Sequence, residues 1–355
     1  MPEKVVITGA GFFGLNAALK LAAKGYEVEL LDKEKQHEYT PGLIDIFRDR
    51  VSSQKLELNL EEFLEDTSVK FSDEKVTGFI PEEDRVETDS SAYNYDYLVL
   101  GLGGEPNTFG TDIGKVETCY RLSDAKRIDQ RLEESESALV IGSGYVGLEV
   151  ASELREKGLE VEVLDVATRP MVNANIGASE IALDYMNEND IVFRGDKNVE
   201  TVERHSAILE NGGKVEADIV IWTTGIQASK LVQRDFETVK NGLEVNKGLC
   251  SQKYSNVFAA GDCADLDVMK TAHNAMNQAE TIAKNIEKGE AENLEGFEEK
   301  FPAILISMGE DGMLEYGEKA YRSKWFRKLK DLVRIRYYYI LRKKKLKLKL
   351  LSLFR

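Results

Sequence analysis

The chain has 355 residues, of which 42% are hydrophobic and 31% charged, so it is long enough for two packed domains and too apolar to be disordered. Its net charge of -16 is unevenly spread, because residues 321 to 355 hold fourteen Lys or Arg and one acid, which leaves the rest near -29. A body this acidic repels phosphates, so we expect no nucleic acid binding.

The cysteines and histidines suggest no metal or disulfide chemistry. Cys119, Cys250 and Cys263 form no closely spaced pair, and the three histidines lie far apart without partners at ligand spacing. The N-terminus lacks the regions of a signal peptide, and no apolar run approaches the ~20 residues of a membrane helix. We therefore expect a cytoplasmic protein without a metal, whose membrane contact is peripheral.

A complete strand, helix and strand unit occurs twice in the sequence. The expected elements of the first copy are a strand over Val5 to Thr8, a helix that ends at Lys24 and a strand over Glu27 to Leu31. Those of the second are a strand over Ala138 to Ile141, a helix that ends at Lys157 and a strand over Val161 to Leu164. This repeat predicts two nucleotide-binding domains.

Each copy carries a glycine fingerprint and ends in an acid. The two sets are Gly9, Gly11 and Gly14 with Asp32, and Gly142, Gly144 and Gly147 with Asp165. The first glycine permits a tight turn, the second lets the backbone approach a pyrophosphate, and the third lets helix and strand pack closely. The acid is placed to accept ribose hydroxyls. Because Asp165 would repel a 2′-phosphate, we expect the second site to prefer NADH, with Arg169 as the residue that would weaken this preference.

Further apolar strands are expected over Tyr97 to Leu100, Ile219 to Trp222 and Asn256 to Ala260. A helix from Thr271 to Ile286 follows, with Thr271 as its N-cap. From Lys288 the composition becomes acidic and irregular until the basic tail begins.

Together these features resemble the two-dinucleotide-binding-domain flavoproteins of the pyridine nucleotide-disulfide oxidoreductase superfamily, and most closely the type II NADH dehydrogenases. The resemblance covers about residues 3 to 286 and is carried by HEYTP (37–41), YDYLVLGLGGEPN (95–107), DIVIWTTGIQAS (218–229) and NVFAAGDCAD (256–265). It implies an α/β fold with two Rossmann-like domains, the NAD domain being inserted in the FAD domain. The implied divisions are FAD domain 1–112 and 240–288, NADH domain 113–239, a short C-terminal interface region 289–323 and a basic amphipathic tail 324–355.

The resemblance implies noncovalent FAD and NADH, with hydride transfer from NADH to the flavin. The residues that it places at the cofactors are Gly9, Gly11, Phe13, Gly14, Asp32, Lys33, Tyr39, Thr40, Pro41, Val76, Gly101, Gly103, Gly142, Gly144, Tyr145, Val146, Gly147, Asp165, Gly225, Gly261, Asp262 and Ala272. Glu149 matches the family's glutamate near nicotinamide and flavin, and is the expected catalytic residue. Glu153 lies one turn later and can pair with Lys157, so we expect it to be structural.

The electron acceptor implied by the resemblance is a membrane quinone, held by His273, Asn277 and Gln278. These positions read AHNAMNQ where quinone-dependent relatives have AQxAxQQ, and Gly101-Leu102-Gly103 replaces Ala-Thr-Gly. Two alternatives remain open: a reductase of a soluble electron carrier, and a slow-turnover redox sensor. A dithiol at 37–41, as in disulfide reductases, is absent from the sequence.

The tail places Trp325, Leu329, Leu332, Val333 and Ile340 at helical spacing, with Lys or Arg between them. This pattern predicts an interfacial helix on anionic lipid at the inner face of the cell membrane. From Arg342 onward Leu and Lys alternate, which is strand-like spacing. The alternative is a basic flap packed on the acidic body or on a partner subunit, and the resemblance is compatible with a homodimer.

Overall fold

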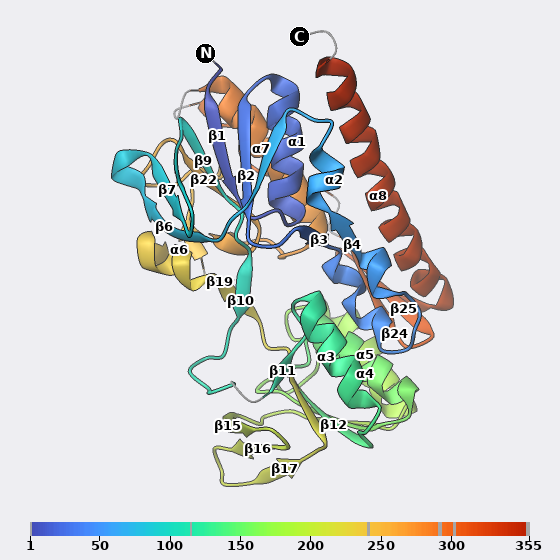
Figure 1. The fold of residues 1–355 in the computed structure, drawn as a ribbon. Helices are drawn as coiled ribbons and strands as arrows, with labels where there is room; N and C mark the ends of the chain where they lie inside the picture. Colours follow the sequence, from blue (N-terminus) through green and yellow to red (C-terminus); the bar gives the residue numbers. More distant parts are fainter. Residues whose placement is uncertain (1, 114–115, 240–241, 290–292, 301–302, 353–355) are drawn as a thin grey trace.

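The computed structural model describes residues 2–113, 116–239, 242–289, 293–300 and 303–352. It has two lobes, each built around a five-stranded parallel sheet with helices against it (Figure 1). The strand orders are β22-β9-β1-β2-β5 and β11-β18-β12-β13-β14. The expected mixed α/β fold with two Rossmann-like units is confirmed.

The first lobe contains the first glycine fingerprint. Its sheet consists of β1 (Lys4–Thr8), β2 (Glu27–Asp32), β5 (Val69–Asp73), β9 (Tyr97–Leu100) and β22 (Val257–Ala259). Helices α1 (Phe12–Lys24) and α7 (Ala272–Lys288) pack side by side, and Thr271 caps α7 as expected. Smaller elements are β3 (Gln36–Glu38), η1 (Thr40–Ile46), η2 (Ser53–Leu56), β4 (Glu57–Asn59), α2 (Leu60–Leu64), β6 (Val76–Ile80), η3 (Pro81–Glu83), β7 (Arg85–Thr88) and β8 (Ala92–Asn94).

The second lobe repeats this arrangement around the second fingerprint. Its sheet consists of β11 (Glu117–Thr118), β12 (Ser137–Ile141), β13 (Glu160–Leu164), β14 (Ile191–Arg194) and β18 (Ile219–Trp222). Its helices are α3 (Leu122–Leu132), α4 (Tyr145–Lys157) and α5 (Ile176–Glu188), and a small antiparallel sheet is formed by β15 (Val199–Glu203), β16 (Ser206–Leu209) and β17 (Lys214–Glu216).

The chain crosses between the lobes on an antiparallel pair, β10 (Gly104–Pro106) and β19 (Ile226–Ala228). Helix α6 (Lys230–Asp235) already packs on the first lobe, where the Asp235 carboxylate accepts a hydrogen bond from the Phe79 N–H at 2.9 Å. The return crossing therefore lies at β19, earlier in the chain than the predicted boundary at residue 239. A helix of six residues is too short to show a helical period in the sequence. The short strands β20 (Thr238–Val239), β21 (Gly242–Glu244) and β23 (Ala264–Asp265) follow it.

Part of the C-terminal region, whose composition is acidic and irregular, forms regular secondary structure that the sequence analysis did not predict. An antiparallel sheet of β24 (Ala303–Met308), β25 (Asp311–Tyr316) and β26 (Lys319–Ser323) leads into α8 (Lys324–Ser352). The strand-like spacing predicted from Arg342 onward is wrong, because helical geometry turns Leu348 onto the body and leaves Leu346 exposed.

Helix α8 packs along α1 and on β24 and β25 (Figure 1). Tyr337, Leu341 and Leu348 are buried on its inner face and belong to the main hydrophobic core. Lys344 donates a 2.5 Å hydrogen bond to the Asn16 side chain of α1, and Lys349 pairs with Asp66. The tail is therefore part of the folded body.

This packing predicts different costs for the same substitution at two positions of α8. Leu341→Ala removes a fully buried side chain and should lower the free energy of unfolding by about 2–5 kcal/mol. Leu346→Ala, whose side chain is 58% exposed, should change it by less than about 0.5 kcal/mol. Thermal and chemical unfolding of the two variants would measure the difference, and equal stabilities would contradict the packing of α8.

Candidate functional site

The first glycine fingerprint forms a tight loop in front of α1. Gly9 has a φ of +92°, and a Cβ atom there would lie 2.1 Å from the carbonyl oxygen of Gly101. At Gly14 a Cβ would lie 1.8 Å from the Gly9 oxygen, so both positions require glycine. At Gly11, in contrast, a Cβ would meet nothing within 4 Å, and no side chain caps the helix. The first N–H groups of α1 thus face open space of the kind that a pyrophosphate fills.

Asp32 fixes the shape of this loop. Its carboxylate accepts hydrogen bonds from the Ala10 N–H at 2.6 Å and from the Glu34 N–H at 3.0 Å. Burial raises the pKa of Asp32. The acid therefore orders the phosphate loop in addition to the ribose contact expected of it.

The second fingerprint repeats these relations. Gly142 has a φ of +104°, a Cβ at Gly147 would lie 2.0 Å from the Gly142 oxygen, and a Cβ at Gly144 would meet nothing within 4 Å. Asp165 accepts hydrogen bonds from the N–H and the hydroxyl of Ser143, both at 2.6 Å. The same geometry thus offers a second dinucleotide site at the N-terminus of α4.

The two lobes meet at Asp262. The Tyr120 hydroxyl donates a 2.8 Å hydrogen bond to the Asp262 carboxylate and accepts one from the Gly104 N–H at 2.9 Å. Burial raises the pKa of Asp262. Gly103, Gly225 and Gly261 all have positive φ and lie in the turns around this contact. Tyr120 was missed by the sequence analysis, because nothing in its neighbourhood marks it.

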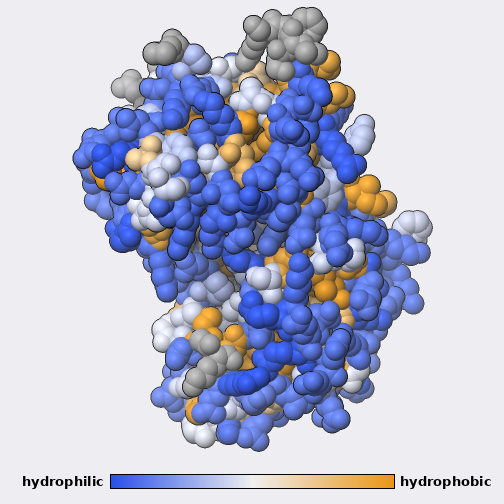
Figure 2. Space-filling view, viewed as in Figure 1, coloured by the Kyte–Doolittle hydropathy of each residue, from blue (hydrophilic) through white to orange (hydrophobic). Residues whose placement is uncertain are grey.

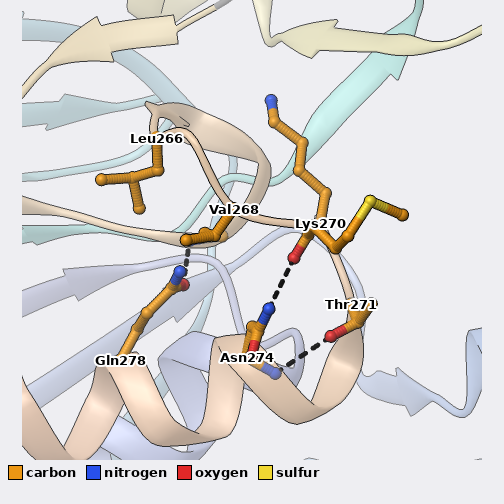
Figure 3. Close-up of a pocket in the computed structure, with 8 residues that line it drawn as sticks. Leu266, Val268, Lys270, Thr271, Asn274 and Gln278 are labelled. Carbon is orange, nitrogen blue, oxygen red and sulfur yellow. Dashed lines mark hydrogen bonds between the residues drawn. The ribbon is translucent and has the colours of Figure 1, made fainter. Parts of the chain in front are cut away.

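The residues expected to hold a quinone do not converge on one point. Gln278 is buried, and its side-chain oxygen accepts a 2.9 Å hydrogen bond from the Gly261 N–H. His273 and Asn277 pair with each other at 3.0 Å on the exposed side of α7. The loop before α7 and the first turns of that helix enclose only about 10 Å³, the space of one water (Figure 3). Gln278 therefore supports the flavin-motif turn.

The HEYTP segment packs against α8 through aromatic rings. Tyr39 and Phe12 contact Tyr337 at ring-centroid distances of 5.6 and 4.8 Å. His37 donates from Nδ1 to the Ala10 carbonyl oxygen and accepts at Nε2 from the Tyr337 hydroxyl, both at 2.8 Å. Burial lowers the pKa of His37 to about 4, so the ring is neutral at pH 7. Helix α8 thus holds the segment that carries Tyr39, Thr40 and Pro41.

The carboxylate of Glu149 lies at the junction of α4, β24 and α8. It accepts hydrogen bonds from the Ser307 N–H at 2.8 Å and the Ser307 hydroxyl at 3.0 Å, and it pairs with Lys330. Lys330 also donates to the Ser307 hydroxyl at 3.1 Å, and the two charged side chains are only 12% and 8% exposed. Lys330 belongs to the tail that was predicted to be an interfacial helix, and the sequence does not indicate its contact with Glu149.

Tyr145, at the start of α4, is positioned by the C-terminal sheet. Its hydroxyl lies 2.5 Å from the Glu315 carboxylate, which also accepts a 2.8 Å hydrogen bond from the Asn175 N–H. Of the other expected residues, Phe13 and Val76 are buried, Lys33 and Val146 are exposed, and Ala272 begins α7.

The cysteines lie in surroundings that keep thiols protonated. Burial raises the pKa of Cys119 and of Cys263 to about 12, and that of Cys250 to about 11. None of the three forms a disulfide. Among the described residues, no group of three His, Cys, Asp or Glu side chains is placed to hold a metal ion.

Comparisons with known proteins agree with this geometry. Residues 3–279 match the family of pyridine nucleotide-disulphide oxidoreductases. The chain belongs to this family. It is 25% identical over 331 residues to a type II NADH:quinone oxidoreductase of Staphylococcus epidermidis, covering 81% of this chain and 82% of the relative.

Two solved structures share the fold over nearly the whole chain. The sulfide:quinone oxidoreductase of Aquifex aeolicus has a TM-score of 0.86 at 18% identity, covering 96% of this chain and 92% of that one. NDH2 of Plasmodium falciparum in complex with NADH has a TM-score of 0.84 at 17% identity, covering 98% and 97%. The protein is thus an NADH-dependent flavin oxidoreductase with FAD and NADH as cofactors.

The two open glycine positions predict selective losses of each cofactor. A Cβ at Gly11 meets no protein atom within 4 Å, so Gly11→Val should fold but lose FAD, because the side chain would occupy the place of the pyrophosphate. Gly144→Val should keep FAD and bind NADH at least about tenfold more weakly, roughly 1.4 kcal/mol. Flavin absorbance measures the bound FAD and NADH titration measures NADH affinity in both variants, so each variant serves as the control for the other. Loss of FAD in both would contradict the assignment of two sites.

Proposed function

We propose that this protein transfers electrons from NADH to a quinone at an anionic membrane surface, at the inner face of the cell membrane. FAD supplies the two-electron chemistry, accepting hydride from NADH and passing electrons onward. The observation that carries the proposal is the double role of α8: its inner face reaches Glu149, and its outer face is apolar and basic.

The residues at the inner face of α8 favour an electron acceptor whose reduction consumes protons. A quinone takes up two protons with its two electrons. The largely buried Glu149 and Lys330 pair, near the start of α4, can hold and pass on a proton. The Staphylococcus epidermidis relative is named a type II NADH:quinone oxidoreductase, which favours the same acceptor.

The outer face supports a position at the lipid surface. Figure 2 shows separate apolar residues among hydrophilic ones on the upper right edge of the molecule, where α8 runs in Figure 1. The exposed apolar side chains of α8 are Trp325, Leu329, Leu332, Val333, Ile335, Tyr339, Leu346 and Leu350, with exposed basic residues between them. An exposed face of this kind fits the lipid interface, to which each basic residue adds roughly 1 kcal/mol. In the described part of the chain, no helix has the length and apolar content to cross a membrane.

Substitutions on the outer face provide a sharper test than truncation, which would expose the core under α8. The triple variant Leu329→Gln, Leu332→Gln, Val333→Gln should keep its flavin and reduce a soluble dye at the wild-type rate. Its sedimentation with anionic vesicles and its activity with a lipid-dissolved quinone should fall at least about tenfold, because the apolar contact is lost.

The matched control changes three exposed apolar residues elsewhere, Leu183→Gln, Val192→Gln and Val239→Gln. This control should bind vesicles like the wild type. Undiminished vesicle binding by the α8 variant would place the membrane contact on another surface.

Sulfide chemistry is the second reaction to test, because the Aquifex aeolicus structure is so similar. It is disfavoured here because the three cysteines form no disulfide and their raised pKa values keep the thiols protonated, and a thiol is a poor nucleophile. Replacing all three by serine or alanine should leave NADH oxidation unchanged within about twofold. Steady-state assays with NADH and with sulfide would check this, and lost turnover with FAD still bound would favour thiol chemistry.

A further inference from the structure

A row of three buried ion pairs leads from Glu149 toward the protein surface. Neighbouring pairs are linked by electrostatic interaction, of Lys330 with Asp45 and of Arg327 with Glu153. The row joins α4, the segment around η1, and α8, and its members are Glu149, Lys330, Asp45, Arg327, Glu153 and Arg50. Arg327 donates a 2.6 Å hydrogen bond to Asp45, and Arg50 donates one of 3.2 Å to Glu153. Of these side chains Glu153 is 0% exposed and Arg50, the most exposed, only 21%.

The outer end of this row reaches solvent. Arg50 also pairs with Glu310 at 2.7 Å, and the Glu310 side chain is 55% exposed. Arg48 lies 3.7 Å from Glu153, 3.5 Å from Glu156 and 3.1 Å from Glu310. Glu153 therefore lies beneath a rim of charged groups, of which Glu310 is exposed and Arg48 and Glu156 are partly exposed.

Three atoms in the middle of the row have no hydrogen-bond partner among the described residues. They are Oε1 of Glu153 and Nε and Nη1 of Arg327, although Nη1 lies 3.6 Å from the Asp331 carboxylate. Buried acceptors and donors left in this way are commonly bridged by water. An ordered water between Glu153 and Arg327 would satisfy both side chains and extend the row from the rim toward Glu149.

Quinone reduction requires a path by which a proton from solvent reaches the site. NADH, one proton and a quinone give NAD⁺ and the quinol, so one of the two quinol protons comes from solvent. The Glu149 and Lys330 pair is largely shielded from solvent, and Glu153 lies four residues after Glu149, on the same face of α4.

We propose that Glu153 carries this solvent proton from the rim at Arg48, Glu156 and Glu310 to the Glu149 and Lys330 pair. The inference rests on the proposed quinone reduction. It assigns to Glu153 a role in proton transfer where the sequence predicted a structural pairing with Lys157. Lys157 instead donates to the Phe47 carbonyl oxygen and pairs with Asp129.

The charges around Glu153 suit a group that gains and loses a proton. Burial raises the pKa of its carboxyl, and Asp45 of η1 raises it further, whereas Arg50 and Arg327 lower it. Tyr185 of α5 and Arg48 also face it. Because the pKa is raised, quinone reduction should slow as pH rises and Glu153 stays deprotonated.

The test compares two acceptors in the full-length, FAD-loaded protein. Two ferricyanide ions oxidise NADH with release of a proton, so that reaction needs no proton delivery. Glu153→Gln should lower quinone turnover at least about tenfold and leave ferricyanide turnover within about twofold. Glu160→Gln, which neutralises an exposed carboxylate at the start of β13, outside the rim, is the matched control and should behave like the wild type with both acceptors.

Glu153→Asp keeps a carboxylate and should restore part of the quinone turnover, with a solvent isotope effect on quinone but not on ferricyanide reduction. The proposed proton transfer through Glu153 is overturned if Glu153→Gln matches the wild type with quinone at every pH. It is also overturned if Glu153→Gln and Glu153→Asp both lose turnover equally with quinone and with ferricyanide. If the wild type reduces ferricyanide but no quinone, the proposed function is wrong, and the proton transfer through Glu153 is wrong with it.

Discussion

Glu149 carries a charge at a place from which most water is excluded. A carboxylate buried without partners is strongly unfavourable, so the fold depends on the ammonium of Lys330 and the two donors of Ser307. These partners come from β24 and α8, far along the chain. The C-terminal region is therefore an integral part of this junction, which holds together the second lobe, the segment around η1 and α8.

The same arrangement of a glycine loop and an acid occurs in both lobes. In each lobe an acid at the end of the second strand accepts a hydrogen bond from the N–H of the residue between the first two glycines. The third glycine lets the helix approach the loop closely. The open positions at Gly11 and Gly144 leave helix N-termini free for phosphate. The two loops thus offer equivalent geometry to a dinucleotide, and they differ in the residues that surround them.

Helix α8 connects the site with the surface. Its inner face is polar where it meets Glu149 and Asp45, and apolar where it joins the core at Leu341. Its outer face combines apolar and basic residues. Under the proposed function, one helix would hold the proton-handling residues in place and present them close to the lipid that contains the quinone.

The sequence by itself determined both nucleotide-binding units, their strands and the cap at Thr271, because these depend on glycines, caps and periodicity within short stretches. It did not give the β24–β26 sheet, the helical end of the tail, or the separation of Gln278 from His273. Nor did it give the partners of Glu149. Ser307 and Lys330 lie 158 and 181 residues away from it, and neither has a local pattern that marks a contact. Only the tertiary structure decided them, because a buried charge selects its partner by position in space and not by distance along the chain.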